Sequence, residues 1–203
     1  YMKHKTAMKN NLIGILDQTY PGVNTYFDSP ARSDGSQKWV DFISTYWHVD
    51  CVRKMSSNAF IDHYQKWCKR NKYNFSQAKA EEIYGTAKEL VPVLPKDEVT
   101  KLIIKQAVDQ LNSASQTVEN LRTLMNETAS KLPEYPVVMQ MKGVGPSLGP
   151  QLISEIGDVT RFHSKGALTA FAGVDPGVNE SGTYAQKSVP TSKRGSADLR
   201  KTL

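Results

Sequence analysis

The stretch KDEVTKLIIKQAVDQLNSASQTVENLRTLMNETASKL, residues 96–132, contains neither proline nor glycine, so nothing in it breaks a helix. Apolar side chains recur in two interleaved seven-residue series, Ile104, Leu111, Val118, Met125, Leu132 and Ala107, Ala114, Leu121. A helix of this length spans about 50 Å, too long for a compact domain to bury alone. We therefore expect a coiled-coil helix that pairs with a second copy of the chain. Because its alanines make the seam thin, pairing with the chain's own preceding helices is the alternative.

The segment that opens the chain predicts a basic amphipathic helix. From residue 2 to about residue 18 the apolar side chains fall at helical intervals, and Pro21-Gly22 then ends the pattern. Three lysines precede the first acidic residue, and they are candidate contacts to nucleic acid: Lys3, Lys5 and Lys9. The alternative is a solvated lysine face over an ordinary core stripe.

Shorter helices are expected between this segment and the long one. Ser36, Ser57 and Ser76 each precede an apolar helical pattern and are candidate N-caps. The aromatic residues of these helices are expected in a core, although the stretch 66–70, Lys-Trp-Cys-Lys-Arg, also suggests a surface on which bases could stack. The proline pair Pro92 and Pro95 is expected to end this region.

Composition favours a soluble globular protein with a moderate preference for polyanionic partners. Lysine and arginine number 26 against 20 acidic residues, which gives 203 residues a net charge of +6. No run of eighteen apolar residues occurs, so we expect no membrane span. Cys51 and Cys68 lie far apart, which predicts no disulfide framework and favours a cytoplasmic protein. The acidic residues and the four histidines are scattered without ligand spacing, so no metal site is expected.

The stretch 136–157 is typical of a helix-hairpin-helix, with two apolar helical segments around the turn Gly143-Val144-Gly145. Glycines in such a turn let backbone N–H groups at a helix N-terminus face a phosphate, so Gly143 and Gly145 are candidate contacts. Pro150 removes a donor from this region, and the second helix is expected to begin late, near that residue.

Six short blocks then follow in a fixed order: Glu155-Ile-Gly-Asp158, Arg161-Phe162, Leu168-Thr-Ala-Phe-Ala-Gly-Val-Asp-Pro176, Glu180-Ser181-Gly182, Thr191-Ser-Lys-Arg-Gly195 and Leu199-Arg200. Together they resemble the carboxy-terminal domain of bacterial insertion-sequence transposases related to the Piv-type DNA invertases, which are regarded as bridge-RNA-guided serine recombinases. The resemblance covers about seventy residues. Upstream of residue 131 the chain resembles these proteins in plan alone.

The resemblance implies an active site made of two parts. An amino-terminal domain would supply carboxylates for Mg²⁺, and the carboxy-terminal domain would supply a serine that attacks the phosphodiester. Ser181 corresponds best to that serine. Ser192 is the second candidate, although it is expected rather to cap the final helix. The resemblance also implies DNA, and a guide RNA, as partners. Candidate nucleic-acid contacts in this part are Lys187, Lys193, Arg194 and Arg200.

The expected fold class is mainly α, with a helical linker region (1–95), a long coiled-coil helix (96–132) and a small helix-hairpin-helix-like terminal domain (133–203) that leaves room for one short β-hairpin. A tyrosine at position 1 and a last helix without a stop signal suggest a piece of a longer protein. Because the carboxylate domain that the resemblance implies is missing, we expect this piece to hold no cofactor and to be inactive alone. The alternative is a non-catalytic helix-hairpin-helix scaffold that binds DNA and dimerises. A helical interaction domain without nucleic acid is the third interpretation.

Overall fold

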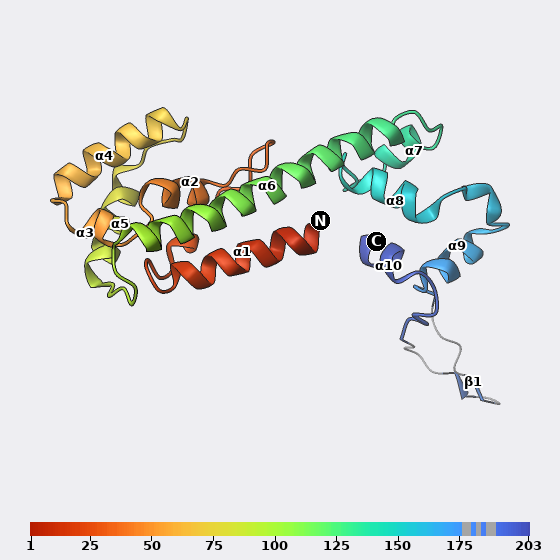
Figure 1. Cartoon of the computed structure of the whole chain (residues 1–203). Helices are drawn as coiled ribbons and strands as arrows, with labels where there is room; N and C mark the ends of the chain where they lie inside the picture. Colours follow the sequence, from red (N-terminus) through yellow and green to blue (C-terminus); the bar gives the residue numbers. More distant parts are fainter. Residues whose placement is uncertain (176–179, 182–183, 186–189) are drawn as a thin grey trace. The chain divides into compact units, whose positions relative to one another are not determined.

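The computed structural model describes residues 1–175, 180–181, 184–185 and 190–203, and its elements are labelled in Figure 1. The described chain is mainly helical, which confirms the expected fold class. It divides into two compact units, Tyr1–Leu121 (unit 1) and Arg122–Leu203 (unit 2). The division at residues 95 and 132 remains a prediction. Among the described residues, no helix is both long enough and apolar enough to cross a membrane.

Unit 1 packs a set of short helices and the first part of a long one around an aromatic core. Its elements are α1 (Met2–Leu16), the 3-10 turn η1 (Val23–Thr25), α2 (Lys38–Thr45), α3 (Asp50–Arg53), α4 (Ser57–Arg70), α5 (Gln77–Glu89) and most of α6 (Glu98–Ala129). The largest fully buried side chains include Tyr20, Phe42, Phe60 and Tyr64. Their edge-to-face and stacked contacts add to the apolar area that each ring removes from water.

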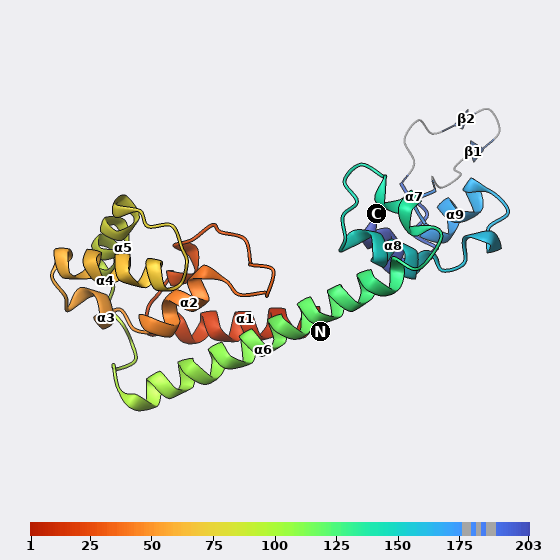
Figure 2. The same cartoon turned by 90° about the horizontal axis from the view of Figure 1, so that it is seen from above.

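Helix α1 lies alongside α6 in both views of the fold (Figures 1 and 2). The two helices run in opposite directions. Lys5 Nζ near the start of α1 lies 3.9 Å from Glu119 Oε1 on α6, whereas Gln18, just after α1, accepts backbone hydrogen bonds from Val93 and Leu94, just before α6. The basic helix predicted from the sequence is thus part of the core of unit 1.

The heptad series of α6 changes its surroundings along the helix. Ile104 and Leu111 are each 1% exposed and belong to the core of unit 1, as does Ala107. Further along the series, Leu121 is 36% exposed, Met125 is 41% exposed and Leu132 is 42% exposed. The first part of the series therefore packs within the chain, as the intramolecular alternative expects, and the pairing of two copies remains a prediction for the rest.

The helix starts agree with the predicted serine caps at one of three positions. Ser76 accepts a hydrogen bond from Lys79 N and caps α5. Helix α4 is capped by Ser56 rather than Ser57, because the Ser56 side chain reaches Ala59 N three residues ahead. Helix α2 begins after Gln37, which makes no side-chain cap, so the prediction for Ser36 was wrong.

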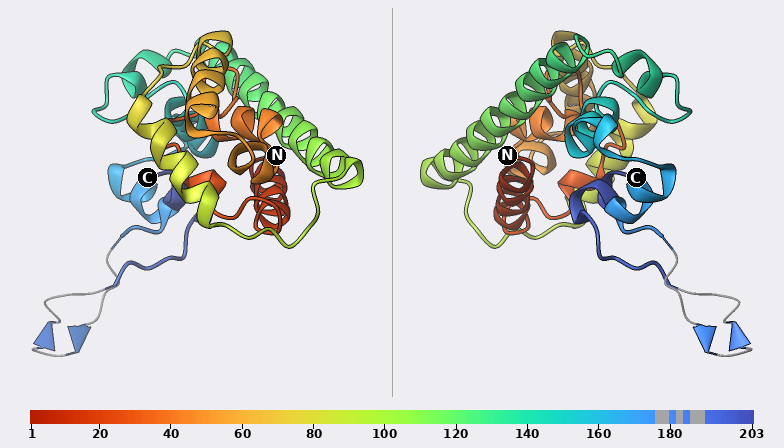
Figure 3. Two further views of the ribbon diagram at one scale, coloured as in Figure 1. Left: turned by 90° about the vertical axis from the view of Figure 1, so that its left-hand side faces the viewer. Right: turned by 90° about the vertical axis from the view of Figure 1, so that its right-hand side faces the viewer.

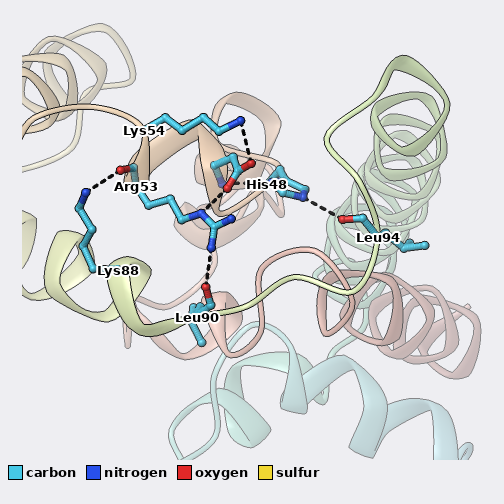
Figure 4. A network of polar contacts seen from close by, with 7 residues as sticks. His48, Arg53, Lys54, Lys88, Leu90 and Leu94 are labelled. Atoms are coloured by element: carbon cyan, nitrogen blue, oxygen red, sulfur yellow. Dashed lines mark hydrogen bonds and ion pairs between the residues drawn. The ribbon is translucent and has the colours of Figure 1, made fainter.

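A buried histidine ties the segment before α6 to the rest of unit 1 (Figure 4). His48 is 1% exposed; its Nδ1 accepts from Asp50 N over 3.0 Å, and its Nε2 lies 3.1 Å from the carbonyl of Leu94. Because Nδ1 accepts, Nε2 is the nitrogen that donates, which fixes one neutral tautomer. Arg53 holds the start of the same segment, because its Nη1 donates to the carbonyl of Leu90 at the end of α5 over 3.0 Å.

Unit 2 is a smaller bundle. Besides the end of α6 it contains α7 (Tyr135–Met139), α8 (Leu148–Ile156), η2 (Val159–Arg161), α9 (Lys165–Ala172) and α10 (Ala197–Thr202), together with the antiparallel strands β1 (Glu180–Ser181) and β2 (Tyr184–Ala185) (Figure 3). Its core is formed by Leu152, Ala172 and Leu199 with partly buried neighbours. Such a small core leaves little margin in stability, so single contacts matter more here than in unit 1.

Candidate nucleic-acid interface

The predicted glycine turn lies between α7 and α8, two helices that pack against one another. Gly143 has φ +90°, a conformation that side chains other than glycine rarely adopt, and it is exposed. A Cβ added at Gly143 or Gly145 would meet nothing within 4 Å. The turn is therefore open to a ligand on its outer side, as a phosphate contact requires.

Helix α8 begins at Leu148, which corrects the expected late start near Pro150. Pro150 falls in the first turn, where its missing N–H needs no intrahelical partner, so it does not delay the helix. Gly149 allows the close packing of α8 on α7, since a Cβ there would lie 2.6 Å from Met139 Sδ. The glycine turn thus directly precedes a formed helix N-terminus, although Ser147 gives that helix no side-chain cap.

The residues Ser192–Gly195, which we call the basic turn, are held against the end of α9. The backbone N–H of Ser192 donates to the carbonyl of Asp175 over 2.9 Å, and that of Lys193 donates to the carbonyl of Gly173 over 3.1 Å. The Ser192 hydroxyl donates to Asp175 Oδ1 over 2.5 Å. Lys193 and Arg194 are exposed, and Lys193 has φ +53°. Two cations are therefore presented on a turn whose backbone is fixed.

Glycines make this close approach possible. A Cβ at Gly195 would lie 2.0 Å from the carbonyl oxygen of Phe171, and one at Gly173 would lie 2.7 Å from Gly195 N. Gly173 also has φ +66° and ends α9 in the left-handed conformation common at helix C-termini. Gly173 at the end of α9 and Gly195 in the basic turn are thus positions at which a side chain would prevent this close approach.

The last helix has a different cap from the one expected. Ser196 Oγ accepts from Leu199 N over 3.2 Å, so Ser196 and not Ser192 caps α10. Arg200 is half-buried, and its Nη1 donates to the carbonyl of Ala172 over 3.2 Å at the end of α9. A cation at a helix C-terminus is favourably placed. Arg200 therefore has a packing role that the sequence pattern did not suggest.

The remaining predicted residues lie outside the glycine turn and the basic turn. Ser181 lies in β1, where its backbone pairs with Tyr184 of β2, and Lys187 lies outside the described residues. Lys3 and Lys9 are exposed on α1, whereas Lys5 pairs with Glu119. These three lysines belong to unit 1, and the turns around Gly143 and Lys193 belong to unit 2.

Two features of unit 2 were missed by sequence reasoning. Asp175, read only as part of a motif block, is the partner of Ser192. The guanidinium of Arg161 lies 4.5 Å from the ring centroid of Phe171 and 4.7 Å from that of Phe162. Hydrogen bonds from Thr160 hold the pKa of Asp158 below its usual range, next to this arginine. Among the residues that the structure describes, no group of three His, Cys, Asp or Glu side chains could hold a metal ion.

Comparison with known proteins finds relatives of one kind. Residues 135–203 match the model of the transposase IS116/IS110/IS902 family. No solved structure matches the chain. The family match thus covers α7, α8, the glycine turn between them and the basic turn.

Two curated proteins are similar over most of this chain. The "Insertion element IS110 uncharacterized 43.6 kDa protein" of Streptomyces coelicolor is 22% identical over 178 residues, 88% of this chain and 42% of that protein. The "Insertion element IS116 uncharacterized 44.8 kDa protein" of Streptomyces clavuligerus is 23% identical over 178 residues, 88% of this chain and 43% of its own length. The chain therefore spans less than half the length of the relatives it matches.

Proposed function

We propose that this chain is part of a DNA transposase and recombinase, in which it binds nucleic acid and supplies the serine nucleophile for strand cleavage and transfer. The observation that carries the proposal is the family match over residues 135–203, the region in which the exposed glycine turn and the basic turn are found. Both turns present groups that suit phosphate. The proposal concerns the whole protein, because this chain spans 42% of the length of its IS110 relative.

Ser181 is the proposed nucleophile. Its Oγ would attack the phosphorus of the scissile phosphodiester and form a covalent phosphoserine link as the bond from phosphorus to the sugar oxygen breaks. The Ser181 hydroxyl would lose its proton, and the leaving sugar oxygen would take one up, so that the leaving strand ends in a hydroxyl. A serine hydroxyl needs activation for such an attack. In the whole protein, Mg²⁺ held by carboxylates in a segment outside this chain would offset charge on the phosphate oxygens.

Ser192 is the second candidate, because its hydroxyl already donates to a carboxylate, Asp175 Oδ1, over 2.5 Å. Such a contact resembles that between a nucleophile and a base. Yet the same Oγ lies 3.5 Å from Arg194 N, which donates to it, and the backbone N–H of Ser192 is bonded to Asp175 as well. We therefore assign Ser192 the task of holding the basic turn.

The basic turn and the glycine turn would together hold a duplex by its backbone. Lys193 and Arg194 would neutralise phosphates, and backbone N–H groups at the start of α8 would bind another phosphate without reading sequence. Lys187, Arg200 and the lysines of α1, Lys3, Lys5 and Lys9, are further proposed contacts. A guide RNA is proposed as an additional partner, on the resemblance alone.

Self-association through α6 is the remaining part of the proposal. Leu124 and Met125 are exposed apolar residues on the later part of the heptad helix, and a second copy would cover them. Replacing both with glutamate should lower the mass measured by sedimentation from dimer to monomer. A monomeric native chain would contradict this part.

The nucleophile is tested in the full-length protein with Mg²⁺ and a duplex carrying the ends of its element. Denaturing electrophoresis should show a covalent protein–DNA adduct that Ser181→Ala abolishes. Ser154→Ala, at an exposed serine of α8, is the matched control and should form the adduct normally. An adduct that survives Ser181→Ala and disappears with Ser192→Ala would transfer the role to Ser192. Cleavage by this chain alone would contradict the proposed division of the active site.

A non-catalytic scaffold is the alternative function, favoured by the glycine turn and the basic turn, which would hold phosphates without any chemical step. It predicts that Ser181→Ala has no effect in the full-length protein. Replacing Lys193 and Arg194 with glutamine weakens binding under either proposal. Each lost phosphate contact should lower the slope of log K against log salt by about 0.9 for a duplex. The adduct, and not the affinity, therefore separates the two functions.

A further inference from the structure

Unit 1 contains a planar cation held over an aromatic ring at its surface. The guanidinium carbon of Arg32 lies 4.0 Å from the ring centroid of Tyr73, and Arg32 is exposed. Its Nη2 donates to the carbonyl of Asn71 over 2.6 Å and to that of Lys72 over 3.3 Å. Ring stacking and two carbonyls thus fix the orientation of this guanidinium before any ligand arrives.

The ring under Arg32 is itself firmly supported. Tyr73 stacks on Trp67 with centroids 5.3 Å apart and an interplanar angle of 20°, and Trp67 stacks on Tyr64 at 5.6 Å and 15°. The Tyr73 hydroxyl donates to Asp41 Oδ2 over 2.6 Å. Trp67 and Tyr64 are buried, so Arg32 and Tyr73 form the outer end of an aromatic column that reaches the core.

Exposed cations lie next to Trp67 and Tyr73 in the sequence. Lys66, Lys69 and Arg70 lie on the last turns of α4, and Lys72 follows in a turn with φ +57°. No ion pair is found for these four or for Arg32 among the described residues, whereas lysines elsewhere in unit 1, such as Lys54, Lys79 and Lys105, are paired with carboxylates. Two carboxylates are nearby, Asp41, which accepts from Tyr73, and Asp34, which interacts electrostatically with Arg32, so they are outnumbered by these five cations.

We infer that Arg32 and the cations at the end of α4 form a binding surface for a single strand of nucleic acid. A base would stack on the Arg32 guanidinium, and the adjacent phosphates would be neutralised by Lys69, Arg70 and Lys72. The partner is a single strand rather than a duplex, because the faces of paired bases are covered by their neighbours in the stack. The inference does not depend on the function proposed for unit 2, and RNA and DNA share the groups that this surface recognises.

The test uses the 203-residue chain with Lys193 and Arg194 replaced by glutamine, so that the basic turn of unit 2 contributes little. Fluorescence anisotropy measures binding of a labelled twelve-nucleotide oligouridine, of oligothymidine, and of a duplex of equal length. Both single strands should bind more tightly than the duplex. Arg32→Lys, which retains the charge but not the plane, should weaken single-strand binding about tenfold, the effect of one lost stacked base.

Charge and folding are controlled separately. Lys69→Gln with Lys72→Gln should lower the salt slope by about 1.4, or 0.7 for each phosphate of a single strand. Lys101→Gln with Lys105→Gln removes the same charge from α6 of the same unit and should leave binding unchanged. Near-ultraviolet circular dichroism checks that Arg32→Lys retains the aromatic column. Equal binding by Arg32→Lys and the parent chain, or tighter binding of the duplex, would overturn the inference.

Discussion

Ser192 and Asp175 are joined twice, by a hydrogen bond from the Ser192 hydroxyl to Asp175 Oδ1 over 2.5 Å and by one from its backbone N–H to the Asp175 carbonyl over 2.9 Å. The pair connects the two ends of the segment that contains Ser181. It also fixes the first residue of the basic turn. Asp175 therefore holds, through its carboxylate and its backbone carbonyl, the start of the turn that carries the proposed phosphate contacts.

Replacing Asp175 with alanine should loosen the basic turn. The hydroxyl of Ser192 would lose a charged acceptor, a bond worth about 1.5–3 kcal/mol. We expect faster amide hydrogen exchange at Lys193 and Ser196 and weaker duplex binding, while exchange in unit 1 stays unchanged. Asp198→Ala, at an exposed carboxylate of α10, is the matched control. Unchanged exchange at Lys193 would show that backbone bonds alone hold the turn.

Replacing Gly195 with alanine should displace the basic turn as a whole. Its Cβ would lie 2.0 Å from the carbonyl oxygen of Phe171, so the turn must move away from Phe171, whose carbonyl accepts from Ser196 N. The expected result is a loss of duplex binding at least as large as that of Lys193→Gln. Gly166→Ala is the control, because its Cβ would meet nothing closer than 3.7 Å, and alanine favours the helix α9. Wild-type affinity of the Gly195→Ala chain would contradict the geometry.

Much of the fold was predictable from periodicity. The long helix, the basic first helix and the two helices around the glycine turn follow from helical spacing and from the positions of proline and glycine. Helix starts were less predictable, as Ser56 and Ser57 show, because two adjacent serines offer the same cap and the backbone register decides between them. The first part and the later part of the α6 heptad series have the same sequence pattern. Only packing in unit 1 distinguishes Leu111 from Met125.

The candidate site was predictable as a set of motif blocks and not as a set of contacts. The sequence places Ser192, Lys193 and Arg194 together, but their attachment to Asp175 and Gly173 links residues that are 17 and 20 positions apart, on either side of β1 and β2. No local rule predicts such pairs. Arg32 and Tyr73 lie still further apart in the sequence, so the stretch 66–70 suggested stacking while the exposed platform involves other residues.

Replacing His48 with alanine should destabilise unit 1. The carbonyl of Leu94 and the N–H of Asp50 would lose their partners in a buried place, and each unsatisfied group costs about 1–3 kcal/mol. The midpoint of urea unfolding, followed by tryptophan fluorescence from unit 1, should fall. His63→Ala, on the exposed face of α4, should have little effect. Equal midpoints for the two variants would indicate that water replaces both contacts.

The buried tyrosines of unit 1 should make its stability sensitive to alkaline pH. Burial raises the pKa of Tyr46 to about 12, and it also raises the pKa values of Tyr20 and Tyr64. An unfolded tyrosine titrates near pH ~10. Above that pH the unfolded chain has released the proton that the folded chain retains, so the free energy of unfolding falls as the pH rises toward 12. Below pH ~10 the contribution is complete and no dependence from these groups is expected.

Urea unfolding between pH 9 and pH 12 measures the effect, and absorbance at 295 nm should show the phenolates forming together with unfolding. Tyr46→Phe removes one titrating group and should lessen the slope. A slope that is the same in Tyr46→Phe would show that Tyr46 ionises equally in both states.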